Sequence, residues 1–365
     1  RQNVPLGEHL ALDRTASFVK EPSRWAATPK FRYQLHKELN KKLAAVSSEQ
    51  KYQPVPVEGC DKDSDCCILS SGVAFSYILD ILKHLNILGK VALYKVSMPY
   101  PLSETFTAGL TRKYQKILVA EETYPVMEMQ ISDRRNVLGK LSGYVPKAGE
   151  LTPDVISPVI HDFLGIPFKK TTVPAAGGRR PSLCPGCPHR ASYFAIRKAL
   201  PKAIYPGDIG CYTLGINLGG VDTCLCMGAS VSQAAGFYHS YYTNGGQVPS
   251  IVATIGDSTF VHSGVGALIN AVYNRARFIL VILDNSTTAM TGNQPTALTG
   301  RLPDNSSGIA VSLEKLLEGC GIRFLKTIDP YEVQELVSLL KEADAFTRDP
   351  DGGIAVIIAK RPCLM

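Results

Sequence analysis

The stretch Ile251-Val252-Ala253-Thr254-Ile255-Gly256-Asp257-Ser258 decides the fold of this sequence, together with Asn285, which follows Asp257 by 28 positions. Residues 251–255 form a short apolar, β-branched run, which is typical of a buried strand. Residues 278–283 form a second such run. Between the two runs lie four apolar residues with the spacing of one helix face: Val265, Leu268, Ile269 and Val272. The pattern predicts a parallel strand–helix–strand unit.

Asp257 and Asn285 therefore follow the carboxyl ends of two strands of one sheet, where open α/β sheets bind ligands. Carboxylate and carboxamide oxygens suit a hard divalent cation, which usually also holds substrate phosphates. The spacing predicts a diphosphate cofactor held through magnesium. The alternative is a strand-end turn followed by an unrelated Asn turn.

The arrangement resembles the thiamine diphosphate motif, in which a Gly-Asp-Gly-like turn and a later Asn hold the magnesium ion. Gly256-Asp257-Ser258 is a variant of that turn, because Ser258 stands where many members have glycine. Thr291-Gly292-Asn293-Gln294, just beyond Asn285, adds to the likeness. The resemblance implies a thiamine diphosphate-binding domain.

Four further segments narrow the resemblance to one family. They are Cys184-Pro-Gly-Cys-Pro-His-Arg190, Gly207-Asp-Ile-Gly-Cys-Tyr-Thr-Leu214, Asp222-Thr-Cys-Leu-Cys-Met-Gly-Ala-Ser230 and Asp284-Asn-Ser-Thr-Thr-Ala-Met-Thr-Gly292. Together they resemble the alpha subunits of indolepyruvate:ferredoxin oxidoreductases, in the superfamily of 2-oxoacid:ferredoxin oxidoreductases. The resemblance runs over essentially the whole chain.

The sequence departs from this family at both ends. It starts at Arg1 without the family's amino-terminal pyrimidine-binding domain. It stops two residues after Cys363, where the family usually continues into a ferredoxin-like domain. Either the sequence is a fragment or those parts belong to other chains. We expect this chain alone to bind the cofactor weakly and to turn over poorly.

The fold class expected is α/β, with two open, mostly parallel-sheet domains. Residues 1–58 are predicted to form an arm with one helix at 31–46. Residues 59–165 are similar to the carboxyl-terminal domain of transketolase-like enzymes, with strands at 67–70, 91–96 and 116–120 and a helix at 75–85. A Pro- and Gly-rich connection at 166–181 precedes the thiamine diphosphate-binding domain at 182–365.

Composition excludes several classes of protein. The chain has 365 residues, of which 45% are hydrophobic and 19% charged, as in globular proteins. Its net charge of +7 comes without a dense basic block, so no nucleic-acid partner is indicated. No apolar stretch approaches the roughly 18 residues that span a bilayer, and no secretory signal is visible. We expect a cytoplasmic protein with no membrane partner.

The ten cysteines indicate metal binding or redox chemistry, because thiols in a cytosol stay reduced. Cys184 and Cys187 form a Cys-x-x-Cys pair, Cys211 follows in a Gly-rich loop, and Cys363 follows a final strand at 354–359. In related oxidoreductases, ligands of a proximal [4Fe-4S] cluster occur in matching places, and four thiolates are the usual complement.

Three other interpretations of these cysteines stay open. The Cys-x-x-Cys pair could be a dithiol redox centre. It could join Cys224 and Cys226 in a zinc site. The cysteines could also pack in the interior as small apolar residues. Cys60, Cys66 and Cys67 are expected to be structural.

The family resemblance implies a set of cofactor residues. Asp257, Asn285 and Thr287, the last through its carbonyl, should ligate Mg²⁺. Residues expected to line the diphosphate and thiazolium are Ser258, Thr259, Met290 and Thr291. Those expected to approach the cofactor rings are Ile209, Gly210, Cys211, Tyr212, Cys226, Met227, Gly228 and Ala229.

Three residues are candidates for contact with substrate or the reacting centre. His189 and Arg190 follow the Cys-x-x-Cys pair, and Arg is a natural partner of a carboxylate. His262 begins the helix after the Asp257 turn. The alternative for each histidine is a polar group with a purely structural role.

The function implied by the resemblance is thiamine diphosphate-dependent oxidative decarboxylation of arylpyruvates, such as indolepyruvate, to aryl-acetyl-CoA. Electrons would pass to ferredoxin, coenzyme A would be the co-substrate, and a beta subunit would be the partner in a heterodimer or higher oligomer. Two alternatives are a non-oxidative decarboxylase or carboligase and a non-catalytic scaffold component of an oxidoreductase complex.

Overall fold

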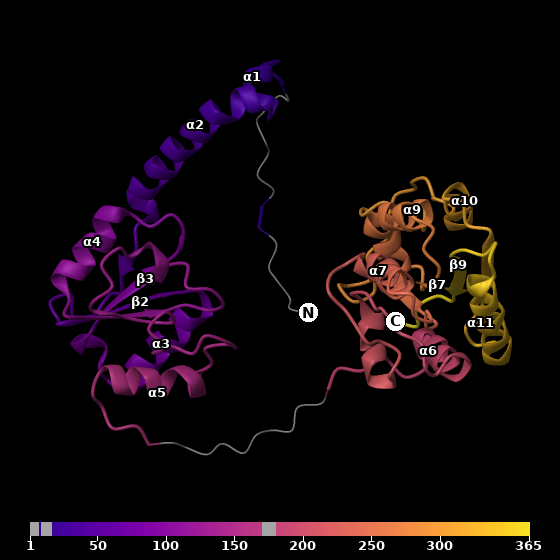
Figure 1. Cartoon of the computed structure of the whole chain (residues 1–365). Helices are drawn as coiled ribbons and strands as arrows, with labels where there is room; N and C mark the ends of the chain where they lie inside the picture. The colour runs from indigo at the N-terminus through magenta and orange to yellow at the C-terminus, as the bar shows by residue number, and fades with distance from the viewer. Residues whose placement is uncertain (1–6, 9–16, 170–179) are drawn as a thin grey trace. The chain divides into compact units, whose positions relative to one another are not determined.

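The computed structural model describes residues 7–8, 17–169 and 180–365. The chain divides into two compact units, residues 1–174 and 175–365, both drawn in Figure 1. Most of the connection predicted at 166–181 falls on residues 170–179, outside the described residues. Of the helices in the described residues, none is long and apolar enough to cross a membrane.

The first unit begins with a helical arm. A single turn, α1 (Pro22–Trp25), precedes α2 (Pro29–Ser48), which contains the helix predicted at 31–46. Pro29 occupies the first turn of α2, where its missing N–H costs no hydrogen bond. No residue of α2 is buried.

The remainder of the first unit is a sheet between two helical layers. Its strands lie in the order β1-β3-β2-β4-β5, and the neighbours are parallel except β1 and β3. One face of the sheet packs on α3 and α5, and the other on α4. The strands are β1 (Val55–Pro56), β2 (Cys66–Ser71), β3 (Ala92–Val96), β4 (Lys116–Ala120) and β5 (Val137–Leu138). The helices are α3 (Gly72–His84), α4 (Glu104–Lys113) and α5 (Pro153–Phe163), with short 3₁₀ turns η1 (Gln50–Tyr52), η2 (Leu88–Lys90) and η3 (Glu128–Gln130).

The second unit contains a four-stranded, all-parallel sheet in the order β6-β7-β9-β8. The strands are β6 (Val252–Gly256), β7 (Ile279–Asp284), β8 (Phe324–Ile328) and β9 (Ala355–Lys360). The helices are α6 (Pro188–Ala199), α7 (Ala229–Thr243), α8 (Asp257–Thr259), α9 (Val265–Tyr273), α10 (Leu313–Gly319) and α11 (Val333–Arg348). A 3₁₀ segment, η4 (Cys211–Leu218), and a π-helical turn, η5 (Phe260–Gly264), complete the unit.

Alternate residues of the central strands face two helical layers. Ile279 and Val281 of β7 pack with α6 and α11, whereas Leu280 and Ile282 pack with α7, α9 and α10. Figure 1 shows α6 and α11 together on one side of this sheet. Because both faces are covered, β6, β7 and β9 are largely apolar, which is why they were recognisable as continuous hydrophobic runs. The edge strand β8 carries the exposed residues Lys326 and Thr327 and gave no such run.

The predicted α/β class with two mostly parallel sheets is confirmed. The helix face predicted between the first two strands is correct except at Ile269, which is 52% exposed, while Ala271 is buried instead. The periodicity also gave no sign of the π-helical turn that joins α8 to α9.

Two glycines of this unit give a matched test of its packing. A Cβ atom on Gly256 would lie 2.3 Å from Cε1 of Tyr212, whereas a Cβ on Gly266, in α9, would meet nothing within 4 Å. We expect Gly256→Ala to lower the free energy of unfolding by about 1–3 kcal/mol through overpacking. Gly266→Ala should raise it by about 0.5–1 kcal/mol, because alanine favours the helix.

Denaturant unfolding of the two variants measures both effects. Equal stability of Gly256→Ala and the unmodified chain would contradict the close approach of Tyr212 to the end of β6.

Candidate cofactor site

The site forms where β6 and β7 end. Gly256 is in register with Leu283, so Asp257 and Asn285 leave the sheet at the same edge. Both side chains are buried. They line a cavity of about 110 Å³. The other lining residues are His189, Ile209, Gly210, Cys211, Tyr212, Met227, Gly256, Ser258, Thr259, Thr287, Thr288, Ala289, Met290 and Thr291.

The carboxylate of Asp257 is incompletely satisfied by the protein. Its Oδ1 accepts a hydrogen bond from the backbone N–H of Ser258 at 2.8 Å. Among the described residues, its buried Oδ2 has no hydrogen-bond partner. Burial, followed by the nearby carboxylate of Asp284, raises the pKa of Asp257 to about 7. A buried carboxylate of this kind is unfavourable without a cation, so the donor set fits a divalent metal ion at this edge.

A neighbouring tyrosine joins two of the loops around the cavity. The Tyr212 hydroxyl donates to the carbonyl of Ile209 at 2.8 Å and lies 2.8 Å from Oγ1 of Thr259. Its ring occupies the space beside Gly256 and Gly210, where a Cβ on either glycine would lie within 2.5 Å of a ring atom. Only glycine lets the backbone approach this ring so closely.

A second buried carboxylate, Asp208, holds the start of α7 against the same loop. Its Oδ1 accepts from the N–H groups of Ile209 at 2.8 Å and Gly228 at 2.9 Å, and its Oδ2 accepts from Ser230 at 3.0 Å. Asp208 is 0% exposed. These three hydrogen bonds hold the start of α7 against the loop that contains Ile209.

The loop after β7 closes the cavity from the other side. Oγ1 of Thr288 donates to Oγ of Ser258 at 3.0 Å, and the N–H of Thr288 donates to the carbonyl of Gln294 at 3.0 Å. Ser286 has a φ of 58°, a left-handed conformation that turns the chain directly after Asn285. Thr287, Met290 and Thr291 thereby line the cavity.

Of the three residues predicted to contact substrate or the reacting centre, one lines the cavity and two do not. His189 lines the cavity, and burial lowers its pKa to about 4, so its imidazole is neutral at pH 7. Arg190 does not line the cavity; its guanidinium donates to the carbonyls of Cys184, at 2.8 Å, and Leu183. His262 is exposed on η5 and is also absent from the lining.

The four predicted cluster cysteines lie in one neighbourhood. The N–H of Cys187 donates to the carbonyl of Cys184 at 3.1 Å, and the N–H of Cys363 donates to the carbonyl of Asn285 at 3.0 Å. Burial, and then the thiols of Cys187, Cys363 and Cys184, raise the pKa of Cys211. Within residues 7–8, 17–169 and 180–365, no three His, Cys, Asp or Glu side chains converge closely enough to hold a metal ion. All ten cysteines are free thiols.

The remaining predicted residues fall outside the cavity lining. Gly228 and Ala229 begin α7, and Cys226 is exposed just before them. Cys224 packs partly buried against the core that contains α6. Three lining residues were absent from the predicted set: Gly256, Thr288 and Ala289. The signal for Thr288 and Ala289 was the family-like segment 284–292, in which they stand beside predicted residues.

Comparison with known proteins agrees with this geometry. Residues 208–358 match the family described as thiamine pyrophosphate enzyme, C-terminal TPP binding domain. The match contains Asp208, Asp257 and Asn285. Thiamine pyrophosphate is thiamine diphosphate under another name, and all of the cavity-lining residues except His189 lie within the matched segment.

Curated relatives identify the family. The chain is 40% identical to the indolepyruvate oxidoreductase subunit IorA of Archaeoglobus fulgidus, over 82% of this chain and 49% of the relative. It is 35% identical to the same subunit of Methanothermobacter thermautotrophicus, over 99% of this chain and 60% of the relative. It is 34% identical to the same subunit of Thermococcus kodakarensis, over 100% of this chain and 60% of the relative. The chain belongs to the family of these IorA subunits.

The chain spans about half to three fifths of the length of these IorA relatives. Among solved structures, a 2-oxoglutarate:ferredoxin oxidoreductase from Magnetococcus marinus has a TM-score of 0.41 and 18% identity, over 52% of this chain and 64% of that chain. A likeness of that size adds nothing to the family assignment, which rests on sequence.

The hydrogen bonds of Asp208 give a prediction for the Ile209 loop and the start of α7. Asp208→Asn replaces one acceptor oxygen by an NH₂ group, which would face a backbone N–H. We expect a loss of about 1–3 kcal/mol in the free energy of unfolding, and weaker binding of thiamine diphosphate with Mg²⁺. Thermal denaturation and titration calorimetry measure the two effects.

The matched control is Asp222→Asn. Asp222 accepts one N–H, from Tyr205 at 2.9 Å, and an asparagine oxygen can keep that bond. If Asp208→Asn were no more disruptive than Asp222→Asn, the three hydrogen bonds would not hold the segments together.

Proposed function

We propose that this chain binds thiamine diphosphate through a Mg²⁺ ion held by the side chains of Asp257 and Asn285 and the carbonyl of Thr287. The proposal rests on the buried Oδ2 of Asp257 at the edge where β6 and β7 end, for which the described part of the chain supplies no hydrogen-bond partner. The family match over 208–358 supports the identity of the cofactor. Mg²⁺ is coordinated by oxygen ligands and usually shares them with phosphates.

We further propose that the chain is the catalytic component of an oxidoreductase that converts arylpyruvates to aryl-acetyl-CoA and reduces ferredoxin. Thiamine diphosphate, when bound, supplies a carbon nucleophile for attack on the keto carbon of a 2-oxo acid. The IorA relatives carry the name indolepyruvate oxidoreductase, which supports the substrate class. The same names describe subunits, which supports assembly with a partner subunit.

Different residues that line the cavity would contact different parts of the cofactor or substrate. Ser258 and Thr259 line the cavity next to Asp257, where the diphosphate would lie. Met227 and Met290, both more than half exposed, line the same cavity and would contact apolar parts of the cofactor. His189 is neutral, so it would donate or accept one hydrogen bond rather than supply a positive charge.

Arg190 has a different proposed role from the one its sequence position suggests. Its guanidinium is committed to two carbonyls of the segment that carries the Cys-x-x-Cys pair. It would therefore position Cys184 and Cys187 rather than bind a substrate carboxylate. His262, which does not line the cavity, would reach a reacting group only from outside it.

The four neighbouring cysteines support a proximal [4Fe-4S] cluster. Four thiolates match the ligand number of such a cluster, and the backbone bond from Cys363 to Asn285 links the terminal segment to the proposed metal site. A cluster, when bound, supplies a one-electron acceptor. The thiols of this structure are neighbours but do not converge as a metal site, so binding would require the side chains to reorient.

The substitution Asp257→Asn tests the proposed metal site. We expect it to have opposite effects on the stability of the metal-free protein and on the binding of thiamine diphosphate. Because burial raises the pKa of Asp257 to about 7, its ionised form at pH 8 is unfavourable in the metal-free protein. We therefore expect the metal-free Asn variant to be at least as stable at pH 8 as the unmodified protein. Mg²⁺-dependent binding of thiamine diphosphate should fall by about 100-fold or more, because the metal loses its charged ligand.

Chemical denaturation and calorimetry on the enzyme assembled with its further domains and partner subunit measure the two effects. Asp304→Asn, on an exposed loop, is the control and should change neither. Unchanged cofactor affinity in Asp257→Asn would refute the site.

The reaction itself is tested by coenzyme A-dependent reduction of ferredoxin or a viologen dye in the assembled enzyme. We expect activity on arylpyruvates and little on pyruvate or 2-oxoglutarate. Cys184→Ser and Cys363→Ser should remove part of the absorbance near 400 nm and abolish electron transfer. Cys320→Ser, at a half-buried thiol just after α10, is the control.

Three results would each contradict one part of this proposal. Equal or greater activity on pyruvate would overturn the substrate class. Full absorbance and full activity in both cysteine variants would refute the cluster. Release of the decarboxylated product without electron transfer would instead favour a non-oxidative decarboxylase.

A further inference from the structure

A second, larger pocket lies at the opposite edge of the same sheet. It has a volume of about 580 Å³ and is lined by residues that precede strands β6 and β7, such as Ile251 and Arg277, and by the end of α11. Strand β6 is five residues long, so roughly 17 Å of strand separates this edge from the cofactor cavity. The pocket is within the range of about 300–1,000 Å³ that small-ligand sites occupy.

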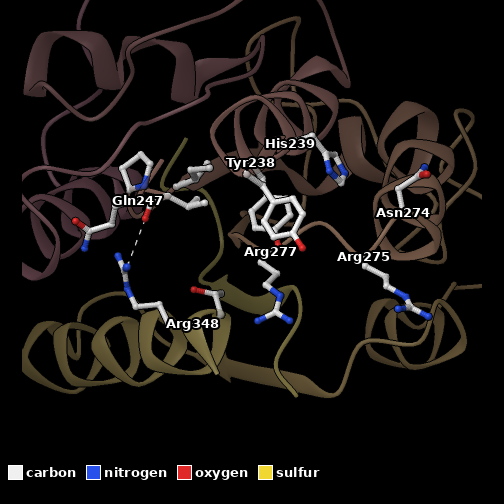
Figure 2. A pocket seen from close by; sticks show the side chains of 12 residues that line it. Tyr238, His239, Gln247, Asn274, Arg275, Arg277 and Arg348 are labelled. Carbon is white, nitrogen blue, oxygen red and sulfur yellow. Dashed lines mark hydrogen bonds between the residues drawn. The ribbon is translucent and has the colours of Figure 1, made fainter. Parts of the chain in front are cut away.

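The pocket is rich in cationic donors. Arg275, Arg277 and Arg348 line it, and none of the described residues that line it is Asp or Glu. Figure 2 shows the three arginines spread along the pocket, with Tyr238 and His239 of α7 above them in this view. Guanidinium groups are the side chains best matched to phosphate oxygens.

Two of the arginines also have a structural role. Arg277 donates to the carbonyls of Asp349 at 2.5 Å and Pro350 at 2.8 Å, which are neutral groups and leave its charge uncompensated. Arg348 pairs with Asp344 at 2.9 Å. The carboxyl ends of α7, α9 and α11 also lie at this edge and offset part of the positive charge. These two arginines alone therefore do not identify a ligand.

Arg275 is the arginine of this pocket that is not used in contacts at the helix ends. Within the described residues, the Arg275 guanidinium makes no hydrogen bond or ion pair. The free guanidinium of Arg275, beside Arg277 and Arg348, whose guanidinium groups are held by hydrogen bonds to the protein, favours an anionic ligand that accepts hydrogen bonds.

An aromatic surface adjoins the cationic groups. The rings of Tyr238 and Tyr242 stack with centroids 5.7 Å apart and an interplanar angle of 15°. Tyr242 is 66% exposed, so much of its side chain is open to solvent. An exposed ring of this kind offers a surface on which a planar heterocycle can stack.

We propose that this pocket binds a nucleotide, with its phosphates on Arg275 and Arg277 and its base against Tyr242. The proposal does not depend on the function proposed for the cofactor cavity, because the two sites share no residue. A ligand at this distance from the cavity would act as an effector and not as a reactant.

The test is equilibrium binding of ADP, with inorganic pyrophosphate as a second probe, to the full chain in EDTA. The Asp257→Asn background and the absence of Mg²⁺ suppress binding of either probe at the cofactor cavity. We expect one ADP per chain, and Arg275→Gln should weaken both probes at least tenfold, which corresponds to about 1.4 kcal/mol. Arg112→Gln, an exposed arginine of the first unit, is the charge-matched control.

Tyr242 separates base recognition from phosphate recognition. Tyr242→Ala should weaken ADP but leave pyrophosphate unchanged, and Tyr242→Phe should retain both. Equal ADP affinity in Arg275→Gln and Arg112→Gln would overturn the proposal, as would no detectable binding of either probe. In either case the role of the arginines would be limited to structural contacts near the carboxyl ends of the helices. Binding of pyrophosphate with ADP unaffected by Tyr242→Ala would overturn the nucleotide assignment.

Discussion

The burial of one carboxylate at the edge of a parallel sheet is the constraint on which the proposed site depends. Asp257 follows β6, is 2% exposed, and keeps Oδ2 without a hydrogen-bond partner in the described residues. A protein rarely leaves such a group uncompensated. Burial, and then the carboxylate of Asp284, raise the pKa of Asp257, because both make the ionised form of this side chain less favourable. A bound cation removes that cost, which links the stability of this edge to its proposed ligand.

Hydrogen bonds hold the loops around this edge of the sheet close to one another. Asp208 gathers three N–H groups from the Ile209 loop and the start of α7. Tyr212 occupies the space that Gly256 and Gly210 leave free and bonds to Thr259. Cys363 is held to Asn285 through the backbone. The segments expected to contact the cofactor, the metal ion and the cysteine cluster are therefore connected by direct contacts within the protein itself.

The sequence was sufficient to predict the inner strands β2, β3 and β4 of one sheet, strands β6, β7 and β9 of the other, and the meeting of Asp257 with Asn285, whereas β1, β5 and β8 were not predicted. The correct predictions follow from continuous apolar runs and from the geometry of parallel strands, which needs no knowledge of side-chain packing. Local pattern did not reveal the role of Asp208, because its three donors come from positions up to 22 residues away. It also suggested a substrate contact for Arg190, whose side chain instead bonds the backbone of its own segment. The direction of a long side chain depends on packing that periodicity does not encode.

The most direct measurement is a crystal structure of the assembled enzyme with thiamine diphosphate and Mn²⁺ in place of Mg²⁺, recorded at the manganese absorption edge. We expect one anomalous peak bonded to the side-chain oxygens of Asp257 and Asn285 and to the diphosphate, at oxygen distances of roughly 2.0–2.2 Å, close to those of Mg²⁺. Cofactor bound with the metal away from Asp257, or a diphosphate held elsewhere on the chain, would contradict it.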